Sequence, residues 1–65
     1  MPIKLRAGWE MILLNGKLCW IISRCKETLS PIPVYWICDE DGKIGTVDFF
    51  DLIPTRETEN KMRME

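Results

Sequence analysis

The chain has 65 residues, and its nine basic and ten acidic side chains leave a formal net charge of −1. This length predicts one small domain of marginal stability, because a domain of such a size buries only about 60% of the surface of its unfolded chain. The balanced charge argues against a polycation that binds any nucleic acid, and the absence of histidine excludes Ser-His and Cys-His nucleophilic pairs.

The first part of the chain predicts a β-hairpin. Gly8 to Leu14 is rich in large apolar residues, and Lys17 to Arg24 is rich in β-branched and aromatic residues, which suit a pleated sheet. The intervening Asn15-Gly16 pair is typical of a type I′ turn, which needs positive φ at both central positions. Both faces of the second strand are apolar, with Trp20 on one and Cys19 on the other, so we expect both faces to be at least partly covered.

The middle of the chain predicts a loop followed by a second hairpin. Pro31 and Pro33 make a helix or a central strand unlikely in residues 25–33. Val34 to Cys38 and Lys43 to Val47 are the next strand candidates, and the sequence DEDG between them ends in an Asp-Gly pair that favours a tight turn. A glycine within the second of these strands indicates a β-bulge at Gly45.

The last part of the chain predicts one short turn, a brief strand and a tail. Asp48 to Leu52 is expected to form a single helical or 3-10 turn, with Asp48 as its N-cap. Ile53 is expected to pair briefly before Pro54 ends the strand. Residues 55–65 lack a strong apolar periodicity and are expected to form a flexible charged tail, with a frayed helix as the alternative. The predicted organisation is therefore an all-β domain over residues 1–54 and a tail over 55–65.

Residues 35–54 resemble the end of SH3-like domains. The matching parts are an aromatic pair that opens a strand, an acidic turn, a short strand with a glycine, a 3-10 turn and a final strand: Tyr35-Trp36, DEDG, Gly45, Val47, DFFD and Leu52-Ile53. The opening motif of eukaryotic peptide-binding SH3 domains is absent, and Asp48 stands where those domains have proline. The chain is therefore more similar to the stand-alone SH3-like barrels of bacteria and phages, and this resemblance implies a five-stranded barrel with a one-turn 3-10 helix near residues 48–52.

The sequence predicts neither a metal centre nor a catalytic centre. Cys19, Cys25 and Cys38 lack the two-residue spacing of metal and redox sites, and two of them lie within apolar runs, where cysteine usually packs as a small core residue. The DEDG sequence lacks the remainder of a calcium-binding loop and is predicted to be a polar hairpin turn. We therefore expect no enzyme activity, no cofactor and no metal.

The chain is expected to be a soluble cytoplasmic protein. The apolar stretch from Met11 to Leu14 is too short for the hydrophobic region of a signal peptide, and no segment approaches the roughly 20 apolar residues of a transmembrane helix. Three cysteines that are expected to stay reduced fit the same compartment. No membrane partner is expected.

The aromatic residues favour a protein-binding surface. Three Trp, one Tyr and two Phe are more than so small a barrel is expected to enclose. Tyr35 and Trp36 point to opposite faces of a strand, so at least one should reach the surface, unless Trp36 covers an open end of the barrel. Exposed aromatics beside charges are typical interface anchors, and acids would steer the protein to a basic partner surface. The candidate partner-binding residues are Tyr35, Trp36, Asp39, Glu40, Asp41, Asp48, Phe49, Phe50 and Asp51.

Two other functions stay open. Residues 1–26 carry an excess of basic side chains, so the barrel could bind nucleic acid, with Trp9 or Trp20 stacking on bases. The candidate phosphate contacts are Lys4, Arg6, Lys17, Arg24 and Lys26. A homodimer in which paired edge strands cover each other is the third hypothesis. If the gene belongs to a phage, the protein partner is expected to be a host enzyme and the effect its inhibition.

Overall fold

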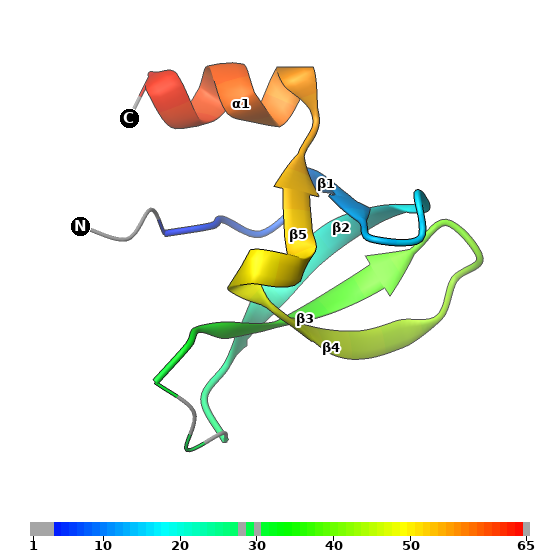
Figure 1. Cartoon of the computed structure of the whole chain (residues 1–65), viewed down its shortest axis with the longest axis vertical. Helices are drawn as coiled ribbons and strands as arrows, with labels where there is room; N and C mark the ends of the chain where they lie inside the picture. Colours follow the sequence, from blue (N-terminus) through cyan, green and yellow to red (C-terminus); the bar gives the residue numbers. More distant parts are fainter. Residues whose placement is uncertain (1–3, 28, 30, 65) are drawn as a thin grey trace.

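The computed structural model in Figure 1 describes residues 4–27, 29 and 31–64. It is mostly β, with five antiparallel strands in one sheet of order β4-β3-β2-β1-β5. The strands β4 and β5 form the two edges of this sheet, which is not closed into a complete ring. The elements are β1 (Glu10–Leu13), β2 (Leu18–Cys25), β3 (Val34–Asp39), β4 (Ile44–Asp48), η1 (Phe49–Asp51), β5 (Leu52–Pro54) and α1 (Arg56–Arg63).

The β1-β2 hairpin is confirmed, but its turn type differs from the predicted one. The backbone N–H of Gly16 donates to the carbonyl of Leu13 (2.8 Å), and the N–H of Leu13 donates to the carbonyl of Lys17 (2.8 Å). Gly16 has φ +87°, whereas no non-glycine residue in the described part of the chain has positive φ. Asn15 therefore does not take the left-handed conformation that a type I′ turn requires, and the loop is a three-residue turn that ends on a left-handed glycine.

The β3-β4 hairpin repeats this turn. The N–H of Gly42 donates to the carbonyl of Asp39 (2.9 Å), and the N–H of Asp39 donates to the carbonyl of Lys43 (2.9 Å). Gly42 has φ +82°, as the last residue of such a loop requires. Both hairpins of the chain are therefore closed by the same arrangement, and in each the glycine supplies the conformation that other residues disfavour.

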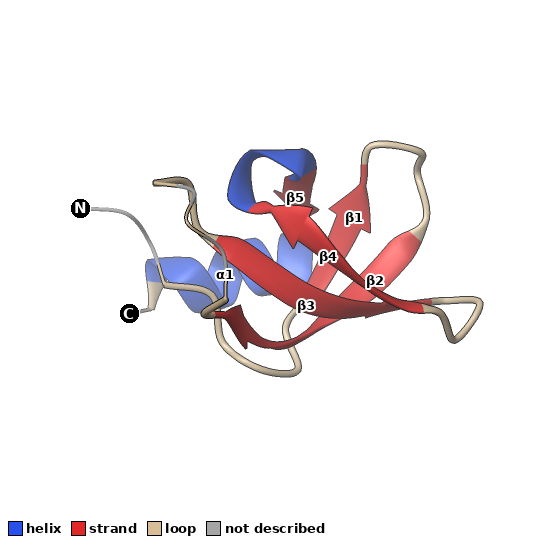
Figure 2. Cartoon of the chain, turned by 90° about the horizontal axis from the view of Figure 1, so that it is seen from below, coloured by secondary structure: helices blue, strands red, loops and turns tan. Residues whose placement is uncertain are grey.

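The register irregularity of the sheet lies in β2 and not at Gly45. Ile21 pairs with Ile37 and Ser23 pairs with Trp36, so one extra residue of β2 stands between the two pairs. Gly45 pairs with Ile37 in an unbroken register, and the predicted bulge at this glycine is wrong. A bulge increases the local bend and twist of its strand. The sheet is visibly curved along β2 and β3 in Figure 2.

One face of the curved sheet holds the core. Met11 pairs with Cys19, and Ile21 pairs with Ile37, so alternate residues of three strands point to the same side. The buried apolar residues are Leu5, Trp9, Met11, Cys19, Ile21, Tyr35, Ile37 and Leu52. Burial, and to a smaller extent the charge of Asp39, raises the pKa of the Cys19 thiol, which keeps this sulfur neutral and unreactive.

A helix, α1, lies where a flexible tail was expected. Its N-cap is Thr55, whose hydroxyl accepts a hydrogen bond from the N–H of Thr58 (3.3 Å). The fully buried hydroxyl of Thr58 donates to the carbonyl of Glu10 (2.6 Å), and Met62 packs against the core. Helix α1 therefore joins the sheet beside β1 and β5. In the described part of the chain, no helix has the length and hydropathy that crossing a membrane requires.

Candidate functional site

The aromatic pair of β3 is divided between the core and the surface. Tyr35 pairs with Val47 on the core side of the sheet and is only 2% exposed. Its hydroxyl accepts a hydrogen bond from the N–H of Leu5 (3.4 Å). Trp36 has the opposite phase and is 37% exposed on the outer face. Of these two predicted partner-binding residues, Tyr35 therefore belongs to the core, whereas Trp36 reaches the surface from the middle of a strand.

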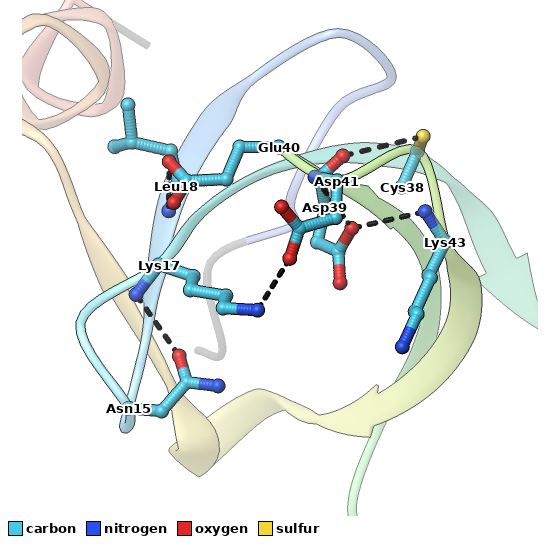
Figure 3. Close-up of polar contacts among 8 residues, drawn as sticks. All are labelled: Asn15, Lys17, Leu18, Cys38, Asp39, Glu40, Asp41 and Lys43. Atoms are coloured by element: carbon cyan, nitrogen blue, oxygen red, sulfur yellow. Dashed lines mark hydrogen bonds and ion pairs between the residues drawn. The ribbon is translucent and has the colours of Figure 1, made fainter.

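Asp39 stabilises its own turn. One of its carboxylate oxygens accepts hydrogen bonds from the backbone N–H groups of Asp41 and Lys43, each at 2.9 Å (Figure 3). These bonds satisfy two donors that the hairpin leaves without a backbone partner. The carboxylate is therefore occupied within the fold and is a poor candidate for a direct partner contact.

Asp41 and Glu40 join the two hairpin turns to each other. The ammonium group of Lys17 forms an ion pair with the carboxylate of Asp41, and this contact raises the pKa of Lys17 by hydrogen bonding and by charge. The backbone N–H of Glu40 donates to the carbonyl of Leu18 (3.0 Å), and the N–H of Leu18 donates to the carboxylate of Glu40 (3.4 Å). We call this set of interactions the turn contact. It gives the acids of the DEDG sequence a structural role.

The turn η1 presents one phenyl ring to solvent. Phe49 is half-buried against the core, and its N–H donates to the carbonyl of Pro33 (2.9 Å). Phe50 is 72% exposed and stands edge-on to Phe49, with ring centroids 5.5 Å apart. Asp48 occupies the N-cap position, as predicted, but its side chain makes no capping hydrogen bond. The carboxylates of Asp48 and Asp51 are both on exposed residues.

The predicted site is therefore reduced to an exposed subset. Trp36 pairs with Thr46, and Val34 pairs with Asp48, so Trp36 and Asp48 are diagonal neighbours on the outer face of β3 and β4. Phe50 and Asp51 lie two and three residues after Asp48 in the chain. We call these four residues the exposed site: Trp36, Asp48, Phe50 and Asp51.

Sequence reasoning missed the neighbours of Trp36 on the outer face. Ile22 and Ile44 are 42% and 66% exposed, although both are aliphatic strand residues. Alternation along the strand places Trp20 and Cys19 on opposite faces, but which face turns outward depends on the cross-strand register. In β4, Ile44, Thr46 and Asp48 are exposed and alternate with the half-buried Gly45 and Val47. The polar residues Thr46 and Asp48, two positions apart, were the available sequence signal for the outward face of this strand.

The residues proposed to contact nucleic acid are only partly available on the surface. Lys4, Arg6, Arg24 and Lys26 are exposed, but Lys17 is paired with Asp41. Of the two indoles proposed to stack on bases, Trp9 is buried in the core and Trp20 is half-buried.

No group of three or more cysteine or acidic side chains that could hold a metal ion occurs among the residues that the structure describes. Comparisons with protein-family models, with curated proteins and with solved structures found no match to this chain.

Proposed function

We propose that this protein is a small non-enzymatic module that binds a protein partner through the exposed site. The observation that carries the proposal is Trp36, a large aromatic residue that is 37% exposed in the middle of β3 and diagonal to Asp48. Tryptophan is the residue type most enriched among interface hot spots, and a phenyl ring at Phe50 adds a second exposed aromatic group.

We further propose that the fold is an open variant of the SH3-like barrel. Two features support this reading: η1 lies between β4 and β5, and the bulged strand β2 pairs with both β1 and β3. Similarity in fold does not identify a ligand. The acids of the exposed site favour a partner with a basic surface, and the resemblance to phage-type barrels makes a host enzyme, inhibited by binding, the proposed partner.

The test is affinity capture of host proteins on the immobilised chain, with Trp36→Ala and Phe50→Ala as variants. Leu14→Ala is the matched control, since Leu14 is 70% exposed but lies in the β1-β2 turn. A partner retained by the wild-type chain and by the control should be lost by Trp36→Ala. We expect this substitution to weaken the affinity by about tenfold or more.

Circular dichroism must show that both variants keep the wild-type fold. A partner that binds Trp36→Ala and Phe50→Ala as tightly as the wild-type chain would contradict the proposed function. An activity assay of the captured protein then decides whether binding inhibits it.

A further inference from the structure

Apolar side chains of three neighbouring strands lie next to one another on the outer face of the sheet. Trp20 pairs with Cys38, and Cys38 pairs with Ile44, so these side chains form a row across β2, β3 and β4. Trp36 is diagonal to this row, and Ile22 stands in the bulge beside Ser23, the partner of Trp36. We call these five residues the outer-face patch: Trp20, Ile22, Trp36, Cys38 and Ile44.

In the described part of the chain, three residues of this patch are exposed, Ile22, Trp36 and Ile44, and the other two, Trp20 and Cys38, are half-buried. Helix α1 lies against β1 and β5, where Thr58 bonds to the carbonyl of Glu10, and Ile44 is still 66% exposed at the other edge of the sheet. Contiguous exposed apolar surface of this kind marks interaction sites in soluble proteins. The buried side of the same strands already holds the core, so these outer side chains are available to a binding partner.

The charged strand residues in the same phase as this patch are acidic. Glu10 pairs with Trp20, so this acid lies at the β1 end of the apolar row. Asp48 lies at the far end of β4, diagonal to Trp36. The nearest cations of the described strands and turns, Arg24 and Lys43, are in phase with the other face of the sheet. Arg24 pairs with the buried Tyr35, and Lys43 lies across from Asp39, which pairs with the buried Cys19. Acids thus border the patch on two sides.

This arrangement decides between two occupants. In a two-fold dimer centred on Trp36 the same surface faces itself, so Glu10 and Asp48 of one copy would face a patch that is bordered by acids as well. Like charges brought together on a desolvated surface cost free energy, whereas lysine or arginine at the same places would pair with both acids. The second copy is disfavoured and a basic partner is favoured.

We propose that the outer-face patch binds a protein segment whose apolar side chains are flanked by lysine or arginine, with Trp36 at the centre of the contact. This inference rests on the proposed function and specifies the partner chemistry for it. The apolar side chains would cover Trp36 and Ile44, and the flanking cations would lie over Glu10 and Asp48.

The test uses two synthetic peptides that share the same leucine positions and differ only in having lysine or glutamate at the flanking positions. Each is titrated into the isotope-labelled full chain and followed by NMR. The lysine peptide should shift the indole N–H signals of Trp20 and Trp36, and it should bind about tenfold or more tightly than the glutamate peptide. The preference should weaken as salt is raised.

Charge reversal supplies the decisive variant. A chain with Glu10→Lys and Asp48→Lys should prefer the glutamate peptide, whereas Glu27→Lys, an exposed loop substitution, should keep the wild-type preference. Ile44→Asp should weaken binding of both peptides, and it acts at an exposed edge position that leaves the core intact.

Equal affinity for the two peptides, no binding of either, or signal shifts confined to other strands would overturn the inference, as would a concentration-dependent dimer abolished by Ile44→Asp. In each of these cases a captured partner that depends on Trp36 would still uphold the proposed function. Capture that does not depend on Trp36 would remove the proposed function itself.

Discussion

Thr58 is a polar residue in an interior whose other buried side chains are apolar. Its hydroxyl donates to the carbonyl of Glu10 and accepts from the hydroxyl of Thr55, so the group is satisfied on both sides. A buried hydroxyl without partners would cost free energy, whereas a satisfied one also fixes geometry. Together with the hydroxyl of Thr55, which also donates to the carbonyl of Glu10 (3.3 Å), this side chain therefore sets where α1 meets β1.

We expect Thr58→Val to lower the free energy of unfolding by about 1–2 kcal/mol, because the shape of the side chain is kept while the carbonyl of Glu10 loses a buried donor. Urea unfolding followed by circular dichroism measures the change. Thr46→Val is the matched control, since Thr46 is exposed on β4 and valine suits a strand. Equal stability of Thr58→Val and the wild-type chain would show that this hydrogen bond is dispensable.

The division of Tyr35 and Trp36 shows what a strand sequence can and cannot predict. Alternation predicted that one ring of the pair reaches the surface, and this is confirmed. Which of the two does so depends on the phase of β3 relative to its neighbours, and a pattern apolar on both faces does not specify that phase. Ile37 pairs with the buried Ile21, and this pairing places Tyr35 inside.

At the scale of elements, both hairpins depend on a glycine in the left-handed region. We expect Gly42→Ala to destabilise the protein by about 1 kcal/mol, because a Cβ atom disfavours φ near +82°. No atom lies within 4 Å of the added Cβ, so the cost comes from the backbone and not from a collision.

Gly45→Ala is the matched control for that substitution. Gly45 lies in regular β4, also with no atom within 4 Å of an added Cβ, and glycine inside a strand is less stable than alanine by about 0.5–1 kcal/mol. The two substitutions should therefore shift the urea midpoint in opposite directions. A shift in the same direction for both would contradict the role assigned to the turn.

The signals for α1 were present in the sequence but are not those of an amphipathic helix. Thr55 is a favourable N-cap, acids occupy the first turn and basic residues the last turn. Glu57 pairs with Lys61 (3.8 Å) and Glu59 with Arg63 (3.6 Å), each one helical turn apart. Apolar periodicity is weak because Thr58 and Met62 make the contacts with the rest of the protein, so a search for an apolar stripe overlooks this helix.

At the scale of the whole molecule, α1 packs one residue, Met62, against the core on the sheet. We expect Met62→Ala to lower the free energy of unfolding by about 1–2 kcal/mol, since Met62 is half-buried and packs against the core. Met64→Ala should have almost no effect, because Met64 is 87% exposed. Thermal unfolding of the two variants makes the comparison. Identical midpoints would mean that α1 is not docked in solution.

The strands, the hairpins and η1 could be predicted from the sequence because their signals are local. The β4–η1–β5 region followed from residues 43–54 alone, and the structure places it as expected. The roles of Asp41 and Glu40 could not be predicted, since their partners Lys17 and Leu18 are more than 20 residues away. The residues of the outer-face patch could not be predicted for the same reason, because the register of β2, β3 and β4 decides which side chains lie next to one another.

The turn contact changes how charge-reversal experiments on this protein must be designed. Asp39 and Asp41 form the most obvious acidic motif in the sequence, and a lysine at either position would remove hydrogen bonds or an ion pair that hold the hairpins together. If such a variant lost binding, the cause would be the loosened hairpins, yet the result would be mistaken for the loss of a direct contact with the partner. Asp48, whose carboxylate caps nothing, is the position at which the sign of a charge can be altered and the result attributed to recognition.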